Sequence, residues 1–129
     1  MMQLFGIGID VVEVERIESS MSEFGDRFAE KVFTQSEREY CDSQRKSGLH
    51  YAARFAAKEA ISKAFGTGIG KDLGWLDMEI VRKESGEPQL VLSGAGKAFA
   101  EKNGIVEVKI SLTHARHYAA ANAVAMMAG

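Results

Sequence analysis

Several residue types are scarce in this sequence, and each shortage excludes a class of protein. The 129 residues contain a single cysteine, Cys41, so no disulfide can form within the chain. A chain without disulfides is typical of a reducing compartment, and we expect a cytoplasmic protein. Cys41 lies in the segment EREYC, a context that favours a buried small residue over a nucleophile.

Long apolar runs and leader segments are also missing. No stretch approaches the roughly 20 apolar residues that a membrane helix needs. The segment MMQLFGIGID lacks the basic and apolar regions of a signal peptide, so we expect no membrane association. Pro88 is the only proline, and no repeat or low-complexity segment occurs. We therefore expect one folded domain over residues 1–129.

Excess charge of either sign is missing too. The formal net charge is −2, so bulk attraction to nucleic acid or to an anionic membrane is not expected. Any site for an anion must therefore be local. The hydrophobic fraction of 46% and the charged fraction of 26% are ordinary for a soluble globular protein.

The segment from Arg54 to Gly70, RFAAKEAISKAFGTGIG, carries the clearest local signal. It is rich in alanine, and neither glycine nor proline interrupts residues 50–65, so we expect a helix that ends at Gly66. Glu59 and Lys63 share one helix face at this spacing. Two interpretations are open: an ordinary surface ion pair before a plain loop, or a charged site beside glycines that let a ligand approach. The glycine pattern matches neither the dinucleotide fingerprint nor the Walker motif.

Residues 4–12 are predicted to form a strand because branched apolar residues alternate with small or acidic ones. One face of this strand is apolar; the other consists of Gly6 and Gly8 followed by Asp10. A bare glycine face lets another backbone or a ligand come close. Asp10 either caps the next helix or serves as an acidic ligand at the strand end.

The remaining pattern predicts an α+β fold, with a small antiparallel sheet packed against helices. The segment Thr34–Glu37 has the form of a capping box, which starts a helix. The last strands follow one another through short turns, which favours antiparallel pairing. The expected helices are 13–21, 24–32, 35–45, 50–65 and 93–103, and the expected strands after the first are 73–82, 89–92, 105–112 and 118–127.

Five stretches together resemble one family. They are GIGIDVVEVERI (6–17), FTQSEREYC (33–41), RFAAKEAISKAFGTGIG (54–70), WLDMEI (75–80) and SLTHARHYAAANAVA (111–125). In this order, and over essentially the whole chain, they are similar to the holo-acyl-carrier-protein synthases, the small stand-alone phosphopantetheinyl transferases. The most specific matches are Asp10, the pair Glu59 and Lys63, and His114.

The resemblance implies a reaction. The phosphopantetheine arm of coenzyme A would move to a serine hydroxyl of apo acyl carrier protein, releasing adenosine 3′,5′-bisphosphate, with magnesium as the metal. It implies Asp10 and Glu59 as metal ligands and Lys63 as a cation on the phosphates, which makes these three the catalytic candidates. Glu59, a water or a carboxylate of the carrier protein would take the serine proton.

The resemblance also implies how the substrates bind. His114 matches the family histidine at the coenzyme A phosphate site, and Arg54 is a second candidate phosphate contact. Lys63 belongs to the cofactor site as well, and Gly66 and Gly68 would let the backbone approach the cofactor. One departure is Ala115, where many relatives carry a polar residue. His50 and His117 are interpreted as structural or surface residues.

Two partners follow from the same resemblance. An acidic carrier protein would dock on basic residues of the first helix, where Arg16 matches the prominent family arginine, although Glu13, Glu15 and Glu18 surround it. Arg27 and Lys31 extend that surface. A homotrimer, assembled around the sheets with coenzyme A at the subunit interfaces, is implied by the family alone. The last apolar strand suits either such an interface or an intrachain sheet.

Two other functions fit the same residues. A small metal-dependent phosphohydrolase acting on a nucleotide would use Asp10, Glu59 and Lys63 without any protein acceptor. A non-catalytic module that binds coenzyme A or a carrier protein would keep binding after either carboxylate is replaced, and would need no metal.

Overall fold

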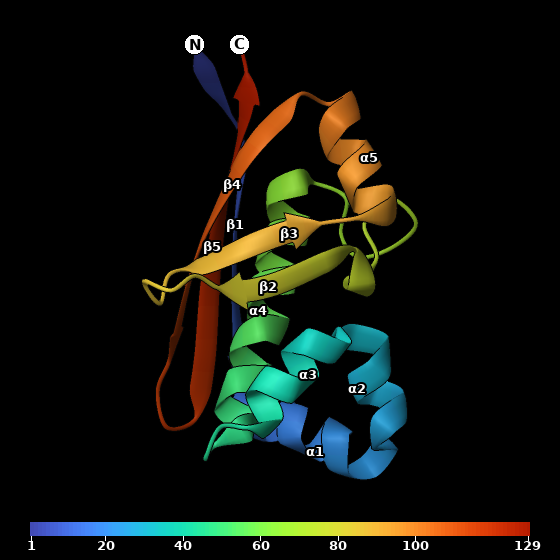
Figure 1. The fold of residues 1–129 in the computed structure, drawn as a ribbon, viewed down its shortest axis with the longest axis vertical. Helices are drawn as coiled ribbons and strands as arrows, with labels where there is room; N and C mark the ends of the chain where they lie inside the picture. The colour runs from blue at the N-terminus through green and yellow to red at the C-terminus, as the bar shows by residue number, and fades with distance from the viewer.

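The structure is a computed structural model that describes residues 1–129. The chain forms five helices, one short 3-10 turn and five strands, and their arrangement is drawn in Figure 1. In chain order they are β1 (Met2–Glu13), α1 (Val14–Phe24), α2 (Asp26–Val32), α3 (Gln35–Asp42), α4 (Ser47–Phe65), η1 (Trp75–Asp77), β2 (Met78–Arg82), β3 (Pro88–Leu92), α5 (Gly94–Lys102), β4 (Ile105–His114) and β5 (Tyr118–Ala128).

The strands form two antiparallel sheets, which confirms the α+β prediction. The larger sheet has the order β1-β5-β4, so the last strand of the chain lies in its centre. The second sheet is the hairpin β2-β3, which crosses in front of α4 in Figure 1. No helix has the length and apolar character required to cross a membrane.

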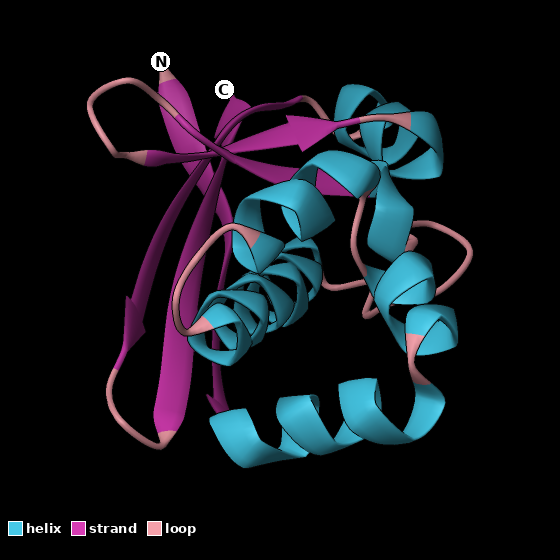
Figure 2. Cartoon of the chain, turned by 60° about the horizontal axis from the view of Figure 1, so that its bottom comes forward, coloured by secondary structure: helices cyan, strands magenta, loops and turns pink.

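All the helices lie on one side of the three-stranded sheet, as Figure 2 shows. The covered face carries the small residues of β5: Ala119, Ala121, Ala123 and Ala125 are all buried. The opposite face carries the branched residues of β1, and Ile7, Ile9 and Val11 are 66%, 66% and 61% exposed. The apolar face that the sequence predicts for this strand therefore points away from the core of its own chain.

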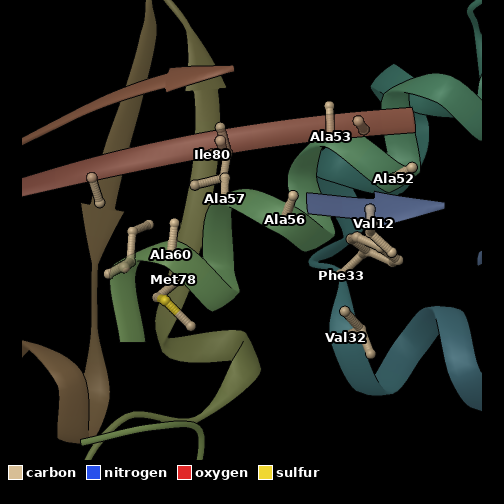
Figure 3. Packing of buried hydrophobic residues seen from close by; sticks show 14 of the residues in the cluster. Val12, Val32, Phe33, Ala52, Ala53, Ala56, Ala57, Ala60, Met78 and Ile80 are labelled. Atoms are coloured by element: carbon tan, nitrogen blue, oxygen red, sulfur yellow. The ribbon is translucent and has the colours of Figure 1, made fainter. Parts of the chain in front are cut away.

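Helix α4 lies in the centre of the molecule. Its alanines contact β1 and β5 on one side and the hairpin on the other, and Figure 3 shows Ala56, Ala57 and Ala60 between these layers. A Cβ atom built on Gly6 or Gly8 would overlap the carbonyl oxygen of Ala64 or Ala60, respectively. The bare glycine face of β1 thus admits a backbone, that of α4, and this close contact holds Asp10 beside the helix.

Several predicted boundaries are wrong, and each has a local cause. The helix predicted over 24–32 is interrupted by Gly25, whose φ of 57° ends α1 and leaves Phe24 exposed. The helix after the capping box ends at Asp42 rather than Arg45. Helix α4 begins at Ser47, so Ser47-Gly48 is not the predicted break. Residues 73–77 form a loop and the 3-10 turn rather than strand, and β4 extends through His114.

A buried ion pair joins α3 to α4. The capping box is confirmed, since the Glu37 carboxylate accepts from the Thr34 N–H at 2.8 Å. The same carboxylate accepts from Lys58 Nζ at 2.7 Å and from the Ile80 N–H at 2.7 Å. Lys58 also donates to the carbonyls of Val32 and Trp75, and both charged side chains are fully buried. The pair therefore ties α4 to the α2–α3 junction, to η1 and to β2.

Candidate functional site

One group of charged side chains, here called the carboxylate cluster, consists of Asp10, Glu59 and Lys63. The ammonium of Lys63 donates to the Ile9 carbonyl at 2.9 Å and to Asp10 Oδ1 at 3.2 Å. Lys63 is thus paired with Asp10 across to β1, rather than with Glu59 along its own helix. The interpretation of Glu59 and Lys63 as a simple surface ion pair is wrong.

Glu59 lies in an environment that disfavours its charge. Partial burial and the nearby Asp10 carboxylate raise its pKa above the usual range, and Lys63 offsets only part of this effect. Two carboxylates that repel one another form a donor set that suits a divalent cation. Magnesium is typically held by one or two protein carboxylates together with waters and substrate phosphates. Asp10 and Glu59 fit that requirement, and they would be the residues that hold it.

The glycine loop begins as the sequence predicts. Gly66 ends α4 in the left-handed conformation with φ of 78°, and Gly68 has φ of 64°. Their backbone N–H groups donate to the carbonyls of Lys63 and Ser62, so these amides are occupied by the helix end. No atom outside the neighbouring residues lies within 4 Å of a Cβ built at either glycine. The loop therefore offers open space to a ligand rather than free N–H donors.

A second group, here called the histidine–arginine cluster, consists of Tyr40, His50, Arg54, Arg82 and His114. It lines a cavity of about 230 Å³ between α3, α4, the β2-β3 hairpin and β4. The rings of His50 and His114 lie 5.4 Å apart, and the guanidinium of Arg54 lies 4.4 Å from the Tyr40 ring centroid. Arg82 donates to the Tyr40 hydroxyl at 2.6 Å. No aspartate or glutamate lines this cavity. It is therefore suited to an anion.

Arg54 is the best-placed cation of this cluster. Only 6% of the residue is exposed, yet its Nε has no hydrogen-bond partner. A buried, unpaired N–H of a charged group is costly, so such a group indicates a missing acceptor. The cluster members Tyr40, His50 and Arg82 were not predicted from sequence. The only available signal was that Tyr40 and His50 precede the RFAAKE segment on helical stretches rich in polar residues.

A wider recess of about 860 Å³ adjoins the same histidine. It is lined by the start of α4 and the β4–β5 turn, with Arg45, Lys46 and Arg116 as cations and Glu18 as the one carboxylate. The consecutive basic residues Arg45 and Lys46, directly before a helix, were a signal for an anion site that was not used in the sequence analysis. His114 borders both this recess and the smaller cavity, so the two form neighbouring parts of one basic surface.

The two clusters lie at opposite edges of the sheet. Lys63 reaches the outer edge of β1, whereas His114 is on β4, and β5 runs between them. Asp10 pairs with Ala121, while His114 pairs with Ala119. Two strand spacings amount to about 10 Å. The structure thus brings Asp10, Glu59 and Lys63 together, and Arg54 and His114 together, but it does not unite the two groups within one chain.

Comparison of the whole sequence with known proteins identifies the family. The family model described as the 4′-phosphopantetheinyl transferase superfamily matches residues 6–123. The chain belongs to this superfamily. It is a phosphopantetheinyl transferase of the holo-[acyl-carrier-protein] synthase type, since two relatives of that name are 50% and 47% identical to it over 89% and 99% of their length.

Named relatives support this membership of the transferase superfamily. The holo-[acyl-carrier-protein] synthase of Ruminiclostridium cellulolyticum is 50% identical, covering 92% of this chain and 89% of that protein. The Helicobacter pylori synthase, solved in complex with coenzyme A, is 34% identical with a TM-score of 0.83, covering 92% of this chain and 98% of that one. The Neisseria meningitidis synthase has a TM-score of 0.90 at 32% identity, covering 95% and 98%.

Two further candidate residues of this transferase can now be located. Arg16 is exposed on α1 and forms no ion pair with the glutamates around it. Cys41 is fully buried, and burial raises the pKa of its thiol to about 12. A thiol so rarely ionised is a poor nucleophile, which agrees with the structural role expected for it.

Proposed function

We propose that this chain transfers the phosphopantetheine arm of coenzyme A to a serine hydroxyl of apo acyl carrier protein. Adenosine 3′,5′-bisphosphate is the other product, and magnesium is required. The observation that carries the proposal is the carboxylate cluster, in which a strand end and the central helix bring Asp10, Glu59 and Lys63 together in a chain of this family.

The side chains of the cluster divide the work of phosphoryl transfer, which consists mainly of positioning and charge stabilisation. Asp10 and Glu59 would hold the cation, which would supply positive charge for the leaving phosphate when bound. Lys63 uses two of its three N–H donors on Ile9 and Asp10, so a third remains for a phosphate oxygen. Its side chain is about half exposed, so a ligand reaches it.

The serine hydroxyl must also lose a proton. Glu59 is the base candidate within the chain, because its raised pKa makes it a better proton acceptor at neutral pH than an ordinary carboxylate. Metal binding and proton acceptance compete for the same two oxygens. A water or a carboxylate of the carrier protein is the alternative acceptor.

The histidine–arginine cluster supplies the second half of the coenzyme A site in this proposal. Arg54 and His114 bind a phosphate group of coenzyme A, and the adjacent recess with Arg45 and Lys46 accepts a further charged part of the same molecule. Gly66 and Gly68 leave room beside the carboxylate cluster. The chemistry and the anchoring of the substrate are thus assigned to different side chains.

The separation of the two clusters supports composite sites between subunits, and the family resemblance makes the assembly a homotrimer. One subunit would supply the carboxylate cluster and its neighbour the histidine–arginine cluster. The exposed face of Ile7, Ile9 and Val11 would lie inside the assembly, since apolar patches of this kind commonly mark interfaces. Ile9→Glu should give monomers in sedimentation; an unchanged trimer would remove this face from the interface.

Carrier-protein docking is assigned to the exposed surface of α1 around Arg16. Arg27 and Lys31 on α2 are exposed as well and extend the basic surface. Electrostatic docking of an acidic partner mainly affects the rate of encounter and the choice of partner.

The deciding experiment is the mass of an apo acyl carrier protein after incubation with this protein, coenzyme A and magnesium. We expect a gain of one phosphopantetheine arm, which a chelator abolishes. Coenzyme A that is cleaved without modification of the carrier protein would indicate a hydrolase. Coenzyme A that binds and remains intact would indicate a binding module.

A further inference from the structure

His50 is the member of the histidine–arginine cluster that the reaction does not explain. It lies in the first turns of α4 and is half-buried, with its ring 5.4 Å from the His114 ring and 5.8 Å from the Tyr40 ring. Both imidazoles line the same cavity. A histidine that served only the packing of α4 would not need to lie in an anion cavity beside a second histidine.

Every charged group that faces His50 is cationic or becomes so. Arg54 comes from its own helix, Arg82 from β2 and His114 from β4, while α3 contributes the uncharged Tyr40. On the hairpin, the Glu87 carboxylate forms ion pairs with Lys83 and Lys109. Partial burial, then His114, Arg54 and Arg82, lower the pKa of His50. The free protein therefore holds His50 neutral at physiological pH.

A phosphomonoester that enters the cavity reverses this situation. Its second ionisation has a pKa of about 6, so near neutral pH it carries close to two negative charges. A dianion between Arg54 and Arg82 offsets the repulsion that these cations add to the effect of burial on His50. A charged imidazole is also the stronger donor to a phosphate oxygen. The cavity of about 230 Å³ is smaller than the roughly 300–1,000 Å³ typical of pockets for whole drug-sized ligands, so it fits one phosphate group rather than a nucleotide.

We propose that His50 joins His114 as a second imidazole that binds the 3′-phosphate of coenzyme A, and that His50 takes up a proton as this phosphomonoester enters. The proposal rests on the proposed function, because it takes coenzyme A as the ligand. Its consequence is that coenzyme A binds more tightly as the pH falls toward 6, while dephospho-coenzyme A does not share that gain.

Calorimetric titration in buffers of different ionisation enthalpy tests the proposal through the number of protons bound. At a pH of about 7.5, coenzyme A should bind with proton uptake, and His50→Gln should reduce that uptake. Near pH 6 the same variant should bind coenzyme A about tenfold more weakly, the effect of one hydrogen bond to a charged group, and near pH 8.5 the difference should largely vanish. Dephospho-coenzyme A should bind the variant and the unaltered protein alike.

Two further variants keep the test decisive. His117→Gln changes an exposed histidine of the β4–β5 turn that lines neither cavity, and should leave proton uptake unaltered. His50→Lys provides a permanent cation, and should bind coenzyme A tightly at high pH with less uptake. Equal uptake by the His50→Gln variant and the unaltered protein would overturn the proposal.

The carrier-protein mass assay is scored separately from the titrations. Transfer with unaltered uptake in His50→Gln would defeat only the role of His50. Lost proton uptake in His50→Gln, together with no transfer by the unaltered protein, would support the role of His50 and defeat the transferase function. Absence of coenzyme A binding would overturn both.

Discussion

The carboxylate cluster and the histidine–arginine cluster flank the same helix but are built in different ways. The carboxylate cluster draws on two elements only. Asp10 lies near the end of β1, and Glu59 and Lys63 lie one turn apart on α4. The second draws side chains from α3, α4, β2 and β4. The three catalytic candidates are thus encoded by one strand and one helix, whereas the anion cavity requires the whole tertiary fold. Substitutions in one cluster should therefore have effects different from substitutions in the other.

Glu59→Gln should remove the chemistry and spare the anchoring of coenzyme A. The amide keeps the size and the helix but is a weaker metal ligand and no base, so we expect kcat to fall at least about 1,000-fold. Carrier-protein modification followed by mass gives the rate, and calorimetry gives the affinity for coenzyme A, expected to stay within about threefold. Turnover close to that of the unaltered protein would sink the ligand assignment.

His114→Ala should have the opposite profile. The loss of one charged hydrogen bond should weaken coenzyme A binding about 10- to 100-fold and leave dephospho-coenzyme A binding unaffected. Parallel titrations of the two ligands measure this. A similar loss for both ligands would mean that His114 contacts another part of the molecule.

A mixture of these two variants tests whether the clusters meet across subunits. The assay uses a coenzyme A concentration too low to saturate His114→Ala, so that neither variant alone is fully active. If each site combines the two clusters from neighbouring subunits, co-refolded Glu59→Gln and His114→Ala chains should regain up to about a quarter of the original activity. Sites contained within one chain would give no recovery. Each variant refolded alone provides the baseline.

Arg16→Glu should affect the protein substrate only. We expect the apparent KM for carrier protein to rise about tenfold, because charge reversal at the rim of an electrostatic interface weakens docking, with no change in the KM for coenzyme A. Steady-state kinetics with each substrate varied in turn measures this. Arg27→Glu is the matched variant on α2, and a change of both KM values by the same factor would remove Arg16 from the docking surface.

The smallest expected effect is on stability. The pKa of Glu59 is raised in the folded state, so the folded protein binds more protons than the unfolded chain between the usual glutamate pKa and the raised value. Stability is lost as the pH rises through that window. Metal-free Glu59→Gln should therefore be more stable at pH 7, by up to about 0.5 kcal/mol, the size of exposed charge–charge effects. Thermal unfolding with chelator present measures this, and the gain should vanish at pH 4.

The comparison of clusters also explains what the sequence could predict. The helix 50–65, the stop at Gly66, the capping box at Thr34 and the strand that carries Asp10 all depend on local spacing, and all are confirmed. Of the two open interpretations of Glu59 and Lys63, the ion pair between them does not form, because Lys63 pairs with Asp10 on β1. A helix pattern cannot reveal which strand lies beside the helix. Membership of the cavity for Tyr40, His50 and Arg82 depends on packing between distant segments, which no local pattern contains.

Lys58 is a further residue whose environment was not predicted from the sequence. In sequence it resembles any surface lysine next to Glu59, yet it is fully buried. A usable signal existed, since Lys58 lies seven residues after Tyr51 and seven before Phe65, both of them buried, and so shares their helix face. This lysine was assigned no role from the sequence, and full burial of a charged residue is rare.

The alanines of α4 do not by themselves determine the position of the helix along its axis. Ala52, Ala56, Ala60 and Ala64 repeat at every turn, so a helix displaced along its axis by one turn would present almost the same surface to β1 and β5. Uniform small side chains therefore do not define a unique position. A lysine buried against one glutamate does, because any such slippage leaves two charges without partners at a cost of several kcal/mol. The ion pair thus determines the position of α4 along its axis. It thereby keeps Glu59 beside Asp10.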